Sequence, residues 1–306
     1  MLPSNPLLVA VANLIQKAPK PVKWSPATMT PGMEKILADE CLKEDPFDQI
    51  QSKRRHYERM KAGNVPLVLK QPNATLVALL DHPSQAEEIP WTLWSQIVQL
   101  FKRPDNKSYT IFFCADPALR TFPKPGEIAK PFHINGGYTY PCDPNCVFLF
   151  RAEDATRVLI HELMHSACCD NTALHLEQRE ADTEAWAELF WCAFMSLGES
   201  LSHAGRVTAS EKARLFQRDL KTLKSLVQKQ DVWSRSQNAR LVRDKNLAPG
   251  PMGFPWRYTI GKTELWAKWG LVSDAPVHPI TSLRLTMPPT KAMKKIFGVK
   301  QTSTIL

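Results

Sequence analysis

The chain has 306 residues, of which 43% are hydrophobic, and it carries a formal net charge of +9 at pH 7. A chain of this length and apolar content can bury a substantial core in one or two domains, which excludes wholesale disorder. No apolar run reaches the roughly 18 residues needed to cross a membrane, so the sequence predicts a soluble protein with no membrane partner.

The amino terminus and the cysteines indicate where the protein works. The first residues lack the basic start, long apolar core and cleavage site of a secretory signal. Lys17, Lys20 and Lys23 precede the first acidic residue, Glu34, which leaves import into an organelle as an alternative. Seven cysteines without such a signal predict a reducing compartment and mostly free thiols, so we expect an intracellular, most simply cytoplasmic, protein.

Four of the cysteines form two close pairs, Cys142-x3-Cys146 and Cys168-Cys169. One interpretation is a second, structural zinc site, and another is a disulfide between Cys142 and Cys146. Adjacent cysteines seldom bind one ion together, and the spacings are not those of a zinc finger. Free thiols therefore remain the expectation for these residues.

The first 80 residues carry no recognisable motif. Residues 33–61 are highly charged and largely helical by pattern, and residues 66–69 and 74–80 are predicted to be short strands separated by a Pro-Asn turn. We expect this region to complete a sheet or to cap a cleft.

The next elements are a helix and two strands. Residues 88–102 have the apolar spacing of an amphipathic helix, and residues 109–114 and 146–150 are predicted to be short apolar strands. Between the strands, His133, Tyr138 and Tyr140 surround a Gly-Gly turn and are candidate oxyanion stabilisers. An extended substrate that adds to the sheet edge would lie along this segment.

The most informative pattern is His161-Glu162-Leu163-Met164-His165, in a stretch from 153 to 169 without Pro or Gly. Residues four apart lie on the same face of a helix, so His161 and His165 can present their imidazoles to one zinc ion. In this HExxH pattern the glutamate between them, Glu162, acts as the general base on water. The apolar neighbours of the histidines are typical of a buried helix.

Catalytic zinc usually takes three protein ligands, and the candidates for the third follow on a second helix, residues 178–194. Glu180, Glu184 and Glu188 are spaced by four on one face of this helix. Three stacked carboxylates repel one another unless a cation or hydrogen-bond donors lie opposite. The pattern therefore predicts a partner for this face, while a solvated acidic face is the alternative.

At this point the chain resembles the gluzincin branch of the zincin metallopeptidases. Glu184 lies 19 residues after His165, which gives HExxH-x18-E, the spacing of the thermolysin-like and aminopeptidase members. The resemblance, over about residues 110–194, implies Glu184 as third ligand and a zincin-like α+β domain with a small mixed sheet. Glu188, one turn on, would orient a ligating histidine through its other ring nitrogen.

Glu180 is the alternative third ligand. The segment Arg179-Glu180-Ala181-Asp182 resembles the ligand segment of small zincins related to phage-repressor-cleaving regulators. The shorter spacing to Glu180 leaves less chain for the turn between the two helices.

The last third of the chain is basic. Residues 201–306 contain 19 Lys and Arg but six Asp and Glu. Residues 209–230 are predicted to form a basic amphipathic helix, a Pro/Gly-rich break follows at 248–255, and the region ends near Lys291, Lys294 and Lys295. Such a region could bind nucleic acid or a large assembly, or it could be a solvated helical face.

These features predict three regions: residues 1–80, a zincin-like core at 81–200, and a mostly helical basic region at 201–306. The leading hypothesis is a zinc metallopeptidase, most simply an endopeptidase, that acts on a protein or peptide. The alternative is an inactive protein of zincin fold that contacts nucleic acid or a large assembly through its basic region.

Overall fold

A six-stranded mixed sheet forms the centre of the part of the chain that the structure describes, residues 5–203, 208–248 and 253–306 of a computed structural model. The outer pairs are antiparallel, whereas β3–β4 and β4–β6 are parallel. The fold is therefore α+β, as predicted, and β5 is one edge of the sheet. In spatial order the strands are β1 (Ser25–Pro26), β2 (Leu67–Gln71), β3 (Ala74–Leu79), β4 (Tyr109–Cys114), β6 (Val147–Leu149) and β5 (Gly137–Thr139).

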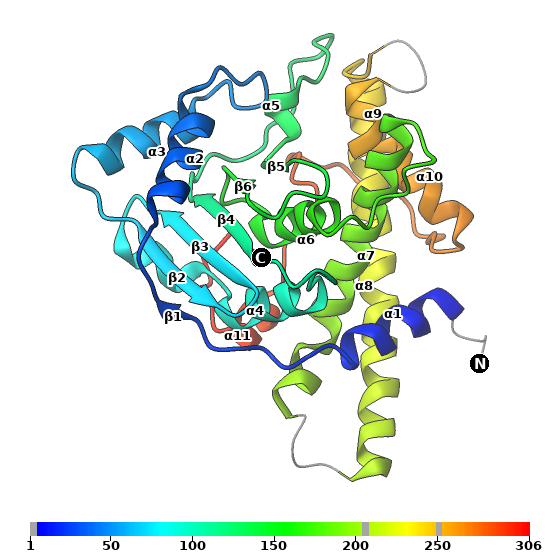
Figure 1. The fold of residues 1–306 in the computed structure, drawn as a ribbon. Helices are drawn as coiled ribbons and strands as arrows, with labels where there is room; N and C mark the ends of the chain where they lie inside the picture. Colours follow the sequence, from blue (N-terminus) through cyan, green and yellow to red (C-terminus); the bar gives the residue numbers. More distant parts are fainter. Residues whose placement is uncertain (1–4, 204–207, 249–252) are drawn as a thin grey trace.

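Helices cover both faces of this sheet (Figure 1). Leu76, Ile111 and Val147 pack with α1 (Pro6–Gln16), α4 (Trp91–Leu100), α6 (Ala155–Ser166) and α7 (Leu176–His203) on one face. The intervening side chains, Val77, Phe112 and Phe148, pack with α2 (Pro31–Leu42) and α3 (Ser52–Lys61) on the other. Burial on both faces explains why β3, β4 and β6 are continuously apolar in sequence rather than alternating.

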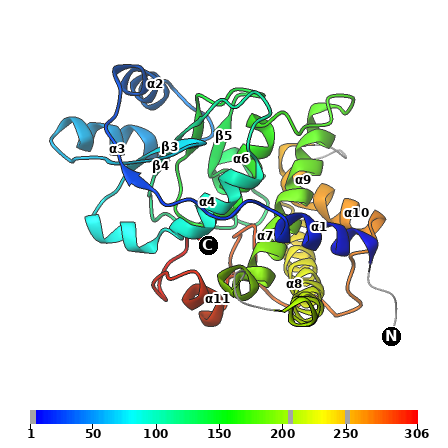
Figure 2. The same ribbon diagram turned by 60° about the horizontal axis from the view of Figure 1, so that its bottom comes forward.

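Helices α8 (Ala209–Arg243), α9 (Phe254–Tyr258) and α10 (Ile260–Lys268) lie together with α7 on one side of the sheet (Figure 1). The long helices α7 and α8 run side by side, with α1 packed across both (Figure 2). The other short elements are η1 (Pro83–Glu88), α5 (Pro131–Ile134) and α11 (Lys291–Ile296).

The region 1–80 completes the sheet, as one of the two predicted roles requires. Its strand β3 pairs in parallel with β4, and its helix α1 contributes to the same apolar cluster as α6 and α8. The sheet crosses the predicted boundary near residue 80, and the cluster crosses both that boundary and the one near residue 200. The division into three ranges remains a prediction about the sequence.

Several predicted elements differ from the structure in extent. The helical segment 33–61 is two helices, because residues 43–51 form an irregular link in which Asp48 accepts hydrogen bonds from the backbone N–H groups of Ser52 and Lys53. The helix predicted at 209–230 continues to Arg243, with buried Leu241 extending its apolar face. The predicted break at 248–255 lies partly outside the described residues.

The carboxyl-terminal residues pack against the start of α6. The backbone N–H groups of Asp154 and Thr156 donate to the carbonyl oxygens of Thr304 and Ile305, at 3.0 and 2.8 Å. Leu306 is fully buried. The first N–H groups of a helix have no partner within the helix, so this segment satisfies two donors at the start of the histidine-bearing helix. Among the described residues, no helix is both long and apolar enough to span a membrane.

Candidate metal centre

Helix α6 carries the two histidines on one buried face, as predicted. The Nε2 atoms of His161 and His165 lie 2.9 Å apart, with the two rings nearly perpendicular. Both side chains are less than a tenth exposed. The i, i+4 spacing of the sequence therefore produces two imidazole nitrogens that face each other.

Glu180 supplies a carboxylate to this pair from α7. Its two oxygens lie 3.6 Å from Nε2 of His161 and 3.6 Å from Nε2 of His165, one oxygen to each ring. These three side chains form the one group among the described residues whose ligand atoms lie close enough together to hold a metal ion. Two imidazoles and a carboxylate are a donor set that catalytic zinc takes, so the residues present fit zinc.

Of the two predicted candidates for a third ligand, the structure brings Glu180, the alternative, rather than Glu184 into the group with the two Nε2 atoms. Glu184 lies one helical turn farther along α7, where its Oε1 is 3.1 Å from Nδ1 of His161 and its other oxygen forms an ion pair with Arg157. The helix begins at Leu176, two residues earlier than predicted, after a turn that starts with Cys168 in the left-handed conformation. The short turn brings Glu180, rather than Glu184, opposite the Nε2 atoms.

Glu188 lies one helical turn away from the position that its predicted role, orienting a histidine, requires. Among the described residues it forms no hydrogen bond or ion pair with a histidine. Its Oε1 lies 3.2 Å from Nε of Arg157 and 2.9 Å from Nζ of Lys262, and it accepts a hydrogen bond from Thr286. Glu184, rather than Glu188, lies beside the second ring nitrogen of a histidine, His161.

The acidic stripe on α7 thus meets a complementary stripe on α6. Arg157, His161 and His165 are spaced by four, and because the contacts run in opposite directions along the two helices, they face Glu188, Glu184 and Glu180 in turn. This confirms the prediction that cations or donors lie opposite the three carboxylates. The sequence already contained a cation for this face that the prediction did not name: Arg157 lies four residues before His161 and so shares its helix face.

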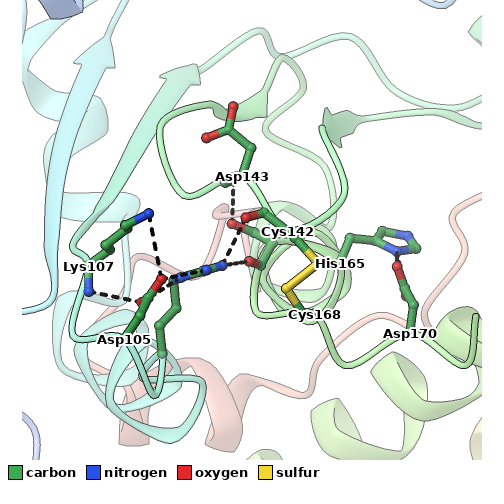
Figure 3. The surroundings of a disulfide bond; sticks show 9 residues. Asp105, Lys107, Cys142, Asp143, His165, Cys168 and Asp170 are labelled. Carbon is green, nitrogen blue, oxygen red and sulfur yellow. Dashed lines mark hydrogen bonds and ion pairs between the residues drawn. A yellow bond between two sulfur atoms is a disulfide. The ribbon is translucent and has the colours of Figure 1, made fainter.

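Asp170 is a second residue that the sequence interpretation missed. Its carboxylate oxygens lie 2.7 and 2.9 Å from Nδ1 of His165 (Figure 3). It also accepts a hydrogen bond from the hydroxyl of Thr183. A carboxylate on Nδ1 fixes the ring so that Nε2 faces a metal. Asp170 lies in the turn between the two helices, and its position as the first acidic residue after the HExxH segment was the available signal.

Charges in the site shift several pKa values. Burial lowers the pKa of His161 to about 4. Burial also acts to lower the pKa of His165, but hydrogen bonds to Asp170 and Glu180 outweigh it and raise this pKa to about 10. The pKa of Glu180 falls well below its ordinary value because its contacts with the two histidines outweigh its burial. Without a metal, the histidine pair therefore holds one proton at neutral pH.

Glu162 faces the same cavity as the three candidate ligands. The cavity has a volume of about 180 Å³. Among the described residues, none forms a hydrogen bond or an ion pair with the Glu162 carboxylate. Burial raises the pKa of this group to about 8. In the metal-free protein this group is therefore largely protonated at neutral pH. Its carboxylate form, which has no protein partner among the described residues, is the form that can accept a proton from a bound molecule.

None of the three predicted oxyanion stabilisers presents its polar atom to the cavity. The hydroxyls of Tyr138 and Tyr140 both donate to Glu40 of α2, and the Tyr138 ring packs with the cluster on the α2 and α3 face of the sheet. His133 lies outside the cavity, where its Nδ1 is 3.0 Å from the backbone nitrogen of Lys130. The sequence could not reveal Glu40, because it lies about 100 residues away and reaches these tyrosines only through the packing of α2 on the sheet.

Helix α9 provides polar groups on the cavity wall that sequence reasoning missed. Arg257 and Tyr258 both line the cavity, and the Tyr258 hydroxyl lies 3.4 Å from Glu180, to which it donates. The Pro/Gly-rich segment 248–255 predicts a break in the chain, and it overlaps the start of this short helix.

Edge strand β5 approaches α6 closely at Gly137. A Cβ atom there would lie 2.6 Å from Val158, closer than real Cβ atoms come. The glycine therefore lets the strand form the cavity wall beside the histidine-bearing helix. This places the edge of the sheet next to the candidate ligands.

A disulfide joins Cys142 to Cys168, which corrects the expectation of free thiols at these positions (Figure 3). The turn after α6 brings the two Cα atoms within 4.7 Å, inside the range that a disulfide spans. Their 26-residue separation conceals this approach in the sequence. Cys146 and Cys169 are free, so the four cysteines neither form a 142–146 disulfide nor gather as a structural zinc site.

Some of the Lys and Arg side chains of the basic region, residues 201–306, are buried in the fold, and others are exposed at the surface. Lys262 and Arg284 are buried and pair with Glu188 and Asp154, whereas Lys291 and Lys295 of α11 are exposed. Contact with nucleic acid or a large assembly remains a prediction.

No protein-family model, curated protein or solved structure matches the chain.

Proposed function

We propose that the protein is a zinc-dependent peptidase whose metal is held by His161, His165 and Glu180. The observation that carries the proposal is the convergence of two imidazole nitrogens and a carboxylate, with the unpaired carboxylate of Glu162 in the same cavity. When bound, zinc supplies Lewis acidity: it polarises a carbonyl oxygen and makes water more acidic.

Glu162 moves the proton in this proposal. Its carboxylate accepts a proton from the attacking water as the water oxygen bonds to the peptide carbonyl carbon. The carbon–nitrogen bond then breaks, and Glu162 gives the proton to the leaving nitrogen. A pKa raised by burial suits a group that must accept a proton and release it again.

The neighbouring residues hold these groups in place. Asp170 orients His165, Glu184 lies against the second ring nitrogen of His161, and Arg157 fixes Glu184. Tyr258 donates to Glu180 from across the cavity. Edge strand β5 leaves unpaired backbone groups along one wall, where an extended peptide can add as a further strand.

The test measures metal content and hydrolysis on the same variants. We expect about one zinc per chain in the wild type by elemental mass spectrometry, loss of zinc with His161→Ala and Glu180→Ala, and retention with Glu177→Ala, a matched change on the same helix. Glu162→Gln keeps zinc but loses cleavage of a mixed peptide library by 10²-fold or more. No zinc uptake by the wild type, or full cleavage by Glu162→Gln, contradicts the proposal.

A further inference from the structure

Three guanidinium groups border the cavity of the candidate metal centre, and two of them have partners. Arg120 forms ion pairs with Glu153 and Asp154, and Arg157 forms ion pairs with Glu184 and Glu188. Their charge is balanced within the protein.

The third, Arg257, has no carboxylate partner among the described residues. Its Nε is buried and forms no hydrogen bond there. Its guanidinium lies 4.9 Å from the ring centre of Phe254 and 5.5 Å from that of Tyr258. These cation–π contacts hold the side chain at the cavity wall and stabilise the charge in part, but they leave its hydrogen-bond donors unused.

A half-buried charge without a counter-ion is costly, so an unpaired arginine in a cavity predicts an anion from outside the chain. The fork of donors on arginine matches a carboxylate in bidentate geometry. Phosphate also fits such a fork, but a peptide, which is the substrate class of the proposed function, carries carboxylates rather than phosphates. The chemistry therefore favours a carboxylate.

We propose that Arg257 binds a carboxylate of the substrate next to the bond that is cut, so that the site selects peptides with an acidic group at that position. The proposal rests on the proposed peptidase function. The carboxylate is either the side chain of Asp or Glu or the free carboxyl terminus of a peptide. A cavity of about 180 Å³ holds the equivalent of about six water molecules, which suits one side chain or one chain end.

Binding is measured first, on zinc-loaded Glu162→Gln protein, so that no cleavage is needed. The probes are fluorescently labelled, end-blocked octapeptides of Ala, Gly and Ser that carry a single Glu, Gln or Lys at each position in turn, and the same peptides without Glu but with a free carboxyl terminus. Fluorescence anisotropy reports the affinity. We expect at least tenfold tighter binding of either the Glu peptides or the free-terminus peptides than of the neutral, blocked ones, and the arm that responds identifies the source of the carboxylate.

Variants at Arg257 in the same background test the assignment. Arg257→Gln removes the preference for the acidic peptide, Arg257→Lys keeps only part of it because lysine has the charge but not the bidentate fork, and Arg257→Glu shifts it toward the Lys peptides. Arg243→Gln, a change at an exposed arginine outside the cavity, leaves it intact. Near-ultraviolet circular dichroism verifies that each variant is folded. Equal binding of acidic and neutral peptides, or an acidic preference that survives Arg257→Gln, overturns the proposal.

Cleavage by protein with Glu162 intact separates this inference from the proposed function. Arg257→Gln is expected to lower kcat/KM at least tenfold on acidic peptides and less than threefold on neutral ones. A uniform loss on all peptides overturns the selectivity and indicates a contact to the reacting carbonyl instead. Acidic peptides that bind through Arg257 but are never cut would contradict the peptidase function alone.

Discussion

The two ends of the α6–α7 contact contain the same kinds of residue in different surroundings. At one end, the enclosed end, Glu188 contacts Arg157, Lys262 and Thr286, which pair with its oxygens. At the other, the open end, Glu180 faces two histidines beside a cavity that Glu162 also lines. Both glutamates lie on one face of one helix, two turns apart.

The difference shows that the role of each carboxylate follows from what α6 places opposite it. A carboxylate that meets permanent cations is fully paired and contributes to stability. A carboxylate that meets neutral or singly protonated imidazoles beside a cavity is available for a metal. Glu184 lies between the two, with one oxygen on Arg157 and the other near His161, and it links the enclosed end to the open one.

The largest expected effect is at the enclosed end. Glu188→Ala leaves Lys262 buried without its counter-ion, and removing one partner of a buried pair typically costs about 3–5 kcal/mol. We expect that loss in the free energy of unfolding, measured by urea denaturation of the metal-free protein.

The controls for Glu188→Ala separate charge from shape. Glu177→Ala on the same helix should change stability by less than about 0.5 kcal/mol. Glu188→Met combined with Lys262→Met should recover most of the loss, because apolar groups of similar volume can replace a buried pair. A loss below about 1 kcal/mol in the single variant would show that the enclosed network does not stabilise the helix contact.

The open end is instead braced by a covalent bond. The Cys142–Cys168 disulfide joins the turn before β6 to the end of α6, next to His165 (Figure 3). Closing a loop of 26 residues is worth about 3.5 kcal/mol in the chain-entropy account. We therefore expect the double variant Cys142→Ser/Cys168→Ser to lose about that much unfolding free energy without a reducing agent.

Reduction of the wild type provides the matching control. In excess dithiothreitol the wild type and the double variant should be equally stable, whereas Cys192→Ser, at a free buried cysteine, should show no redox dependence beyond that of the wild type. Equal stability of oxidised and reduced wild type would mean that the disulfide does not brace this end.

Much of this arrangement could be predicted from local spacing. The strand at 109–114 follows from a short, largely apolar run. The histidine-bearing helix, the acidic stripe of α7 and its need for partners follow from a spacing of four residues. Which of Glu180, Glu184 and Glu188 lies opposite the Nε2 atoms of the two histidines could not be predicted, because it depends on where α7 begins. That depends on the left-handed turn at Cys168, which no spacing rule specifies.

Contacts between distant segments were also beyond sequence reasoning. Tyr138 and Tyr140 were predicted to face a substrate, but the packing of α2 brings Glu40 to their hydroxyls. Arg257 and Tyr258 reach the cavity only because α9 packs against α7. Such contacts depend on tertiary packing rather than on local pattern.

A smaller effect is expected where the two ends are linked. Glu184→Gln removes the charge beside Nδ1 of His161, and Asp170→Asn removes the charge on Nδ1 of His165. Residues that orient metal ligands typically contribute 10–100-fold to metal affinity, or about 1.4–2.7 kcal/mol. We expect losses in that range from competition with a zinc-binding dye, while Glu180→Ala loses more. If Glu184→Gln lost more affinity than Glu180→Ala, the assignment of the third ligand would be reversed.

The smallest effect is a pH dependence confined to the open end. In the metal-free protein, the pKa of His165 is raised to about 10 and that of His161 lowered to about 4, so the pair carries one proton at neutral pH. A metal needs both nitrogens deprotonated, so zinc uptake must release that proton and become tighter as the pH rises. We expect zinc affinity to increase about tenfold per pH unit, or about 1.4 kcal/mol, from pH 7 to 8.5, where an ordinary histidine is already neutral.

Calorimetry in two buffers of different ionisation enthalpy counts the released protons, and Asp170→Asn should flatten the dependence because it lowers the pKa of His165. A flat profile in the wild type would mean that His165 is neutral before the metal arrives, and that the charges around Glu180 do not distinguish the open end from the enclosed one.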